Sequence, residues 1–133
     1  MQRRTLLGLG AATGALLALA GGGAALLYER AWRDGKLLPA GRNVLAAVAR
    51  AVLDGSLPSD SATQTAALEA HLTRIEATVG AMPSHTQGEI ADLLALLALP
   101  PLRATVVGLS GAWADAPLAD IQAALQSMRR SPL

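Results

Sequence analysis

Apolar residues in the C-terminal two thirds of the chain recur at the three- and four-residue spacing of helices, and Gly and Pro separate the apolar stretches. The first stretch begins at Asn43, a residue type that caps helix N-termini, and stops at Gly55. Leu57-Pro58 then favours an extended exit, because the residue before a proline avoids helical geometry. The expected buried stripe of this helix is Val44, Leu45, Val48 and Val52.

A second and longer stretch starts at Ser59 or Asp60 and ends at Gly80 and Pro83. Apolar residues at one-turn spacing predict a continuous buried face on this helix. That face consists of Leu68, Leu72, Ile75 and Val79. The polar residues between them are expected to point to solvent, namely Glu69, Arg74 and Glu76.

A third helix is predicted over Ile90–Leu99, opened by a capping box at Thr86–Glu89 and broken by Pro100-Pro101. Its leucines surround the helix almost completely: Leu93, Leu94, Leu96, Leu97 and Leu99. A helix that is apolar on nearly every side is either buried at the centre of a domain or keeps one face for a partner. The sequence leaves both alternatives open.

The rest of the chain predicts a short helix from about Leu102 to Leu109, a loop that contains Gly111 and Trp113, and a last helix that starts near Pro117. The apolar stripe of the last helix is Leu118, Ile121, Leu125 and Met128, and Arg129 and Arg130 suit the negative end of its dipole. No stretch predicts a strand. We therefore expect an all-α protein, with a signal or anchor helix followed by a domain of four to five helices over residues 43–133.

The first 28 residues have a different pattern. Arg3 and Arg4 precede 24 residues, Thr5–Tyr28, without any charge, which is long enough to cross a bilayer. Arg3-Arg4 followed by Thr5 and the apolar pair Leu6-Leu7 resembles a twin-arginine export signal, a route that carries folded proteins. Ala18 and Ala20 offer a small-x-small cleavage site, yet the apolar run continues past it, so a cleaved signal and an uncleaved anchor both stay open. Residues 29–42 are expected to be a polar junction.

Composition narrows the function. The hydrophobic fraction of 52% includes no Phe, one Tyr and two Trp, which predicts a thin aliphatic core of modest stability. A formal net charge of +1, without a basic stripe, argues against nucleic acid as a partner. Zero cysteines exclude disulfides and thiolate metal sites.

The sequence contains no pattern of residues that predicts catalysis, cofactor binding or metal binding. His71 and His85 are the two histidines, and neither lies in a metal-binding motif. Carboxylates occur singly along the predicted helices, and no strand is available to present a nucleophile. We therefore expect no catalytic, cofactor-binding or metal-ligating residue in this chain.

Four segments resemble one family. Arg3–Leu7, the stretch Val48–Pro58 with its Leu-Asp-Gly-Ser-Leu-Pro end, and the later Glu89–Leu94 and Leu125–Ser131 are similar to the gluconate 2-dehydrogenase subunit 3 family. These are the small subunits of periplasmic flavoprotein dehydrogenases. The resemblance implies a non-catalytic subunit that carries the twin-arginine signal and escorts a larger flavin-bearing subunit, often with a cytochrome subunit as electron acceptor.

This resemblance implies a location in the periplasm, or in the inner membrane with the body facing the periplasm, and contact with the export machinery. A stand-alone membrane-anchored helical scaffold of the cell envelope is the alternative. A small enzyme is the third hypothesis, and the lack of a catalytic pattern ranks it last.

Overall fold

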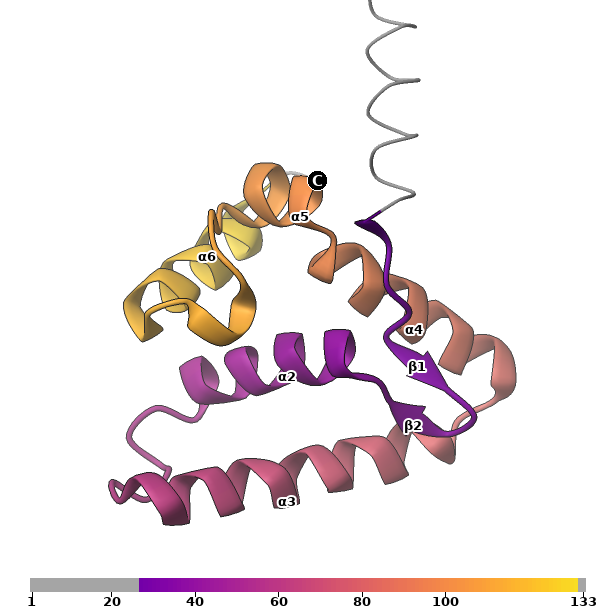
Figure 1. The fold of residues 1–133 in the computed structure, drawn as a ribbon, viewed down its shortest axis with the longest axis horizontal. Helices are drawn as coiled ribbons and strands as arrows, with labels where there is room; N and C mark the ends of the chain where they lie inside the picture. Colours follow the sequence, from indigo (N-terminus) through magenta and orange to yellow (C-terminus); the bar gives the residue numbers. More distant parts are fainter. Residues whose placement is uncertain (1–26, 132–133) are drawn as a thin grey trace, which may run out of the picture.

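Residues 27–131 are the part of the chain that the computed structural model describes, and most of them are helical (Figure 1). The prediction of a mainly helical protein is therefore confirmed in its coarse form. The predicted signal or anchor helix lies outside the described residues and stays a prediction.

A short β-hairpin precedes the first helix of the body, and the expectation of no strand is wrong here. Strands β1 (Trp32–Arg33) and β2 (Lys36–Leu37) pair antiparallel, with Trp32 opposite Leu37. Asp34 and Gly35 make the two-residue turn with φ of 50° and 79°. Positive φ at both positions is what Asp-Gly hairpin turns favour. Part of the expected polar junction is thus ordered and buries Leu37.

Helix α2 (Pro39–Val52) is the central helix and begins four residues before Asn43, the predicted cap. Proline at the first helical position suits this start, because its missing N–H has no partner in the first turn anyway. The predicted stripe is partly wrong, since Val44 is buried but Val52 is exposed. The core face is instead formed mainly by small residues: Ala40, Val44, Ala47 and Ala51.

Helix α3 (Ser61–Gly80) begins and ends as the sequence predicts. The Asp60 side chain caps it by accepting hydrogen bonds from the Thr63 backbone N–H (3.0 Å) and the Thr63 hydroxyl (2.8 Å). Leu72 and Val79 are buried as expected.

Helix α4 (Ser84–Ala98) starts six residues before Ile90, and the predicted capping box does not form. Thr86 and Glu89 lie inside the helix, and Pro83 occupies the cap position. Gln87 satisfies free carbonyls of the preceding turn instead, because its side-chain amide donates to the carbonyls of Met82 (2.8 Å) and Gly80 (3.2 Å).

Beyond Leu99 the chain bends by 71° into α5 (Pro100–Leu102) and the π-helix η1 (Arg103–Val107). Gly108 ends this segment in the left-handed region, with φ of 86°. The 3₁₀-helix η2 (Trp113–Asp115) and α6 (Leu118–Arg130) complete the body. The short helix and the last helix therefore lie close to their predicted positions.

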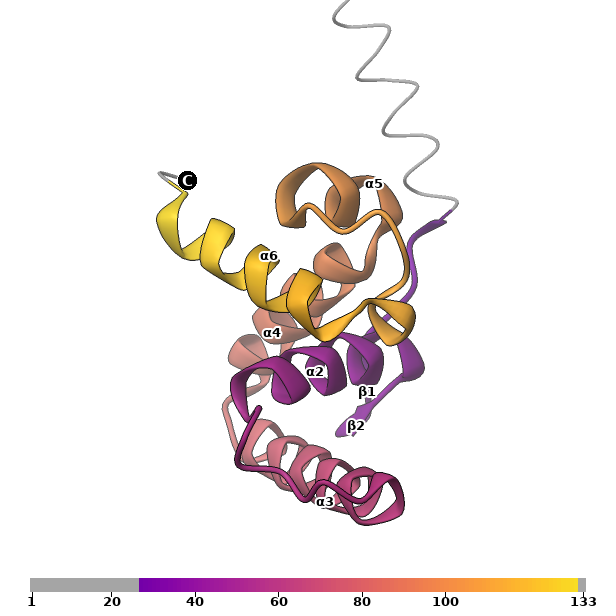
Figure 2. The ribbon, with the colours of Figure 1, turned by 90° about the vertical axis from the view of Figure 1, so that its left-hand side faces the viewer.

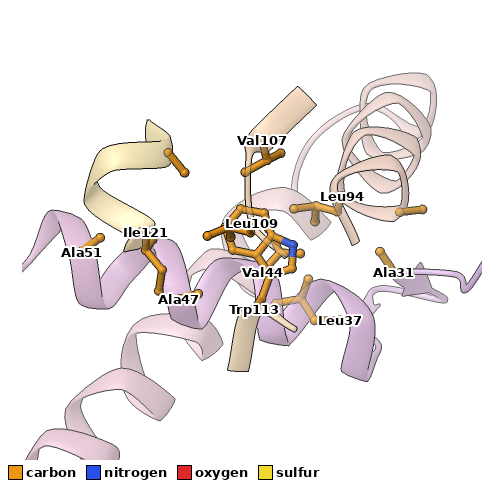
Figure 3. Close-up of a cluster of buried hydrophobic side chains, with 12 residues drawn as sticks. Ala31, Leu37, Val44, Ala47, Ala51, Leu94, Val107, Leu109, Trp113 and Ile121 are labelled. Atoms are coloured by element: carbon orange, nitrogen blue, oxygen red, sulfur yellow. The ribbon is translucent and has the colours of Figure 1, made fainter. Parts of the chain in front are cut away.

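The core lies between α2, α4, α6 and the segment that contains η1 and Trp113 (Figure 3). Helix α2 has α3 on one side and α6 on the other (Figures 1 and 2). Its buried alanines let the neighbouring helices approach closely. The largest side chain in this core is Trp113, whose indole N–H donates to the Leu97 carbonyl at 2.9 Å. The other labelled core side chains are Ala31, Leu37, Val44, Ala47, Ala51, Leu94, Val107, Leu109 and Ile121.

Candidate partner-binding surfaces

The residues predicted to carry export lie outside the described part of the chain. These are Arg3, Arg4, Leu6 and Leu7 of the signal and Ala18 and Ala20 of the cleavage site. Their roles stay predictions.

Between residues 27 and 131 no single helix has both the length and the apolar character needed to span a membrane. Helix α4 together with Pro100–Val107 meets both criteria as a pair, but the pair is bent by 71°.

Helix α4 presents an open apolar face. Leu94 and Ala95 are buried against the body, whereas Leu93 is 57% exposed and Leu96 is 44% exposed. Residues three apart in a helix lie on the same side, so these two leucines form one surface. Glu89, one turn before Leu93, is also exposed. Helix α4 is therefore not buried on all sides by residues 27–131, because one of its apolar faces is uncovered.

A cavity of about 280 Å³ lies where the described chain begins, between the start of α2, the end of α4 and α5. Trp113 lines this cavity and is fixed by two hydrogen bonds, one from its indole N–H and one from the Arg50 guanidinium to its carbonyl (3.4 Å). The remaining lining residues are Leu27, Glu29, Ala40, Asn43, Ala98, Pro100, Arg103 and Ala112.

Arg103 is the unusual side chain of this cavity. Its buried Nε atom has no hydrogen-bond partner among residues 27–131. A buried donor without a partner is destabilising by about 1–3 kcal/mol, so most such atoms in proteins are paired. No sequence pattern marks Arg103, since one arginine in a short apolar segment forms no motif.

Glu76 is a structural anchor, and its predicted outward position is wrong. Its carboxylate accepts hydrogen bonds from the Leu37 backbone N–H (2.9 Å) and the Lys36 ammonium (3.1 Å), and so ties the hairpin to α3. The hydrogen bond from Leu37, aided by that from Lys36, holds the pKa of Glu76 below its ordinary value. Glu69, by contrast, is exposed as expected and forms an ion pair with Arg42.

The two histidines lie apart from these surfaces. His71 is half-buried in α3, and His85 is exposed in the first turn of α4, where its ring lies 3.4 Å from the Thr86 hydroxyl. Among the described residues, no three His, Cys, Asp or Glu side chains are grouped so that they could hold a metal ion.

Comparison with protein-family models, with curated proteins and with solved structures finds no match for this chain.

Proposed function

We propose that this protein is a non-catalytic accessory subunit that escorts and stabilises a periplasmic flavin-dependent dehydrogenase during twin-arginine export. The observation that carries the proposal is the open leucine face of α4, formed by Leu93 and Leu96. The N-terminal pattern of Arg3-Arg4 and an uncharged run supports an exported or inner-membrane location. The resemblance to the small subunits of such dehydrogenases names the partner class.

The leucine face suits a protein partner. Single exposed apolar residues are common on protein surfaces, but two leucines on one helix side form a contiguous patch. A partner that covers them removes apolar surface from water and stabilises the complex at roughly 25 cal/mol per Å². We expect the folded body to be stabilised by such a partner, because its own core contains many alanines and one tryptophan.

Co-expression with the flavoprotein encoded next to this gene tests the proposal. We expect the full chain to retain the flavoprotein through purification and the L93S/L96S variant to release it. V52S is the matched control, because Val52 is an even more exposed apolar residue on a different helix. Recovery of the full chain without any flavoprotein, in cells that make both, would contradict the proposal.

The alternative is a stand-alone, membrane-anchored scaffold of the envelope. It is favoured by the apolar residues that continue from the candidate cleavage site through Leu27. This hypothesis predicts an uncut N-terminus by mass spectrometry and a stable monomer in calorimetry without a partner. The accessory-subunit proposal predicts instead that the unfolding temperature rises when the flavoprotein is present.

A further inference from the structure

One end of the molecule gathers three chain segments that are distant in sequence. The start of the described chain, the α5–η1 segment and the C-terminal end of α6 all lie toward the same end, away from α3 (Figures 1 and 2). Leu27 lines the same cavity as Pro100 and Arg103, which places the first described residue beside α5.

The side chains at this end combine exposed apolar groups with positive charge. Val106 is 57% exposed, Leu27 is 49% exposed and Tyr28 is 43% exposed. The basic residues of these segments are Arg30, Arg103, Arg129 and Arg130, and the acidic residue is Glu29. Asp92 of α4 lines a pocket together with Arg30. The connection from α2 to α3, by contrast, carries the acidic residues Asp54 and Asp60.

Chain continuity decides what covers this end. The uncharged run Thr5–Tyr28 finishes at it. If that run anchors in the inner membrane, which is one of the two locations proposed above, then Tyr28 lies at the bilayer surface and α5–η1 lies beside it. Tyrosine and arginine are residue types that favour the headgroup region, where an apolar body and a polar tip are both accommodated.

We propose that the α5–η1 segment, Pro100–Val107, rests on the surface of the lipid bilayer in which the N-terminal run is anchored. Val106 then contacts the acyl boundary, and the arginines of this end lie at the level of the lipid phosphates. This inference rests on the inner-membrane location, which is one of the two locations that the proposed function allows. It leaves the leucine face of α4 free for the protein partner.

Single-cysteine labelling tests the inference, because the chain has no native cysteine. The full chains V106C and A104C place an environment-sensitive fluorophore on η1, and A70C places it on α3 as the matched control; all three positions are exposed. The proteins are reconstituted into vesicles of phosphatidylethanolamine and phosphatidylglycerol. We expect lipid-attached quenchers to dim the η1 labels at least about twofold more than the α3 label, and aqueous iodide to do the reverse.

Two outcomes overturn the inference. If the protein floats with the vesicles but the η1 labels are quenched by iodide as strongly as the α3 label, then α5–η1 does not contact lipid, and the partner-binding proposal is unaffected. If the full chain does not float with vesicles, then the anchoring itself fails. Loss of flavoprotein capture through Leu93 and Leu96 is a separate result, since it is measured on a different face.

Discussion

Gly41 lies at a helix position where replacing glycine by alanine is expected to destabilise the protein. A Cβ atom at position 41 would lie 2.6 Å from the carbonyl oxygen of Ala31, closer than real Cβ atoms approach backbone oxygens. Elsewhere in a helix, replacing Gly by Ala is stabilising by about 0.5–1 kcal/mol. The close contact between α2 and the residue before the hairpin therefore requires glycine here.

We predict that G41A lowers the free energy of unfolding by about 1–3 kcal/mol, because the added methyl group forces apart two packed backbones. G88A is the matched control, since Gly88 also lies inside a helix and a Cβ there meets no heavy atom of the described chain within 4 Å. It should raise the free energy of unfolding by about 0.5–1 kcal/mol. Urea unfolding followed by circular dichroism measures both, and equal effects of the two substitutions would refute the steric argument.

The carboxylate of Glu76 is expected to make the stability of the fold depend on pH. Because its pKa is lowered in the folded protein, its contribution to stability is present above the ordinary glutamate pKa of about 4.3 and is lost as the pH falls through the lowered value. We expect E76Q to be less stable than the wild type at neutral pH, with the difference shrinking in acid. E89Q, at an exposed position on α4, is the control and should follow the wild-type curve. Unfolding temperatures measured between pH 3 and pH 7 give the comparison.

Helix α4 separates stability from binding on adjacent residues. Leu94 is buried in the core, while Leu93 faces outward. L94A should lower the free energy of unfolding by about 2–5 kcal/mol, because it leaves a cavity. L93A should change it by no more than about 0.5 kcal/mol while weakening capture of the flavoprotein. Chemical unfolding and co-purification on the same two variants check this, and a destabilised L93A would show that the face supports the fold rather than a partner.

The C-terminal ends of the helices were predictable from the sequence because they depend on local backbone chemistry. Gly55, Gly80 and Pro100 each stop or break a helix close to the expected residue. The hairpin was predictable in principle, since Asp34-Gly35 is the dipeptide that two-residue turns favour. Its strands are two residues long, which is too short for the alternating apolar pattern that predicts a strand.

Helix faces were harder to predict, because they depend on contacts with distant segments. In α2 the predicted residues Leu45 and Val48 are only partly buried against the core and Val52 is exposed, whereas Ala47 and Ala51 are buried. In the second half of α4 leucines lie on nearly every side, so the positions of the neighbouring segments decide which of them stay exposed. For the same reason the unpaired Nε atom of Arg103 emerges only from the packed structure.

At the scale of the whole molecule, the chain combines two parts with different proposed roles: an N-terminal export signal and a folded body. The twin-arginine route carries folded proteins, so export should depend on both the export signal and the stability of the folded body. The L94A variant, with an intact N-terminus but a weakened core, should therefore reach the periplasm less efficiently than L93A. Cell fractionation at a raised growth temperature measures this difference.

The export signal itself is tested by replacing Arg3 and Arg4 with lysine. The substitution keeps both positive charges, so an anchor held only by charge on the cytoplasmic side should insert as before. A route that requires the guanidinium groups should instead leave the protein, together with its flavoprotein, in the cytosol. R129K/R130K makes the same chemical change in the last turn of α6 and should leave export intact. Fractionation followed by immunoblotting decides between them, and a periplasmic R3K/R4K variant that still delivers the flavoprotein would remove the twin-arginine route from the proposal.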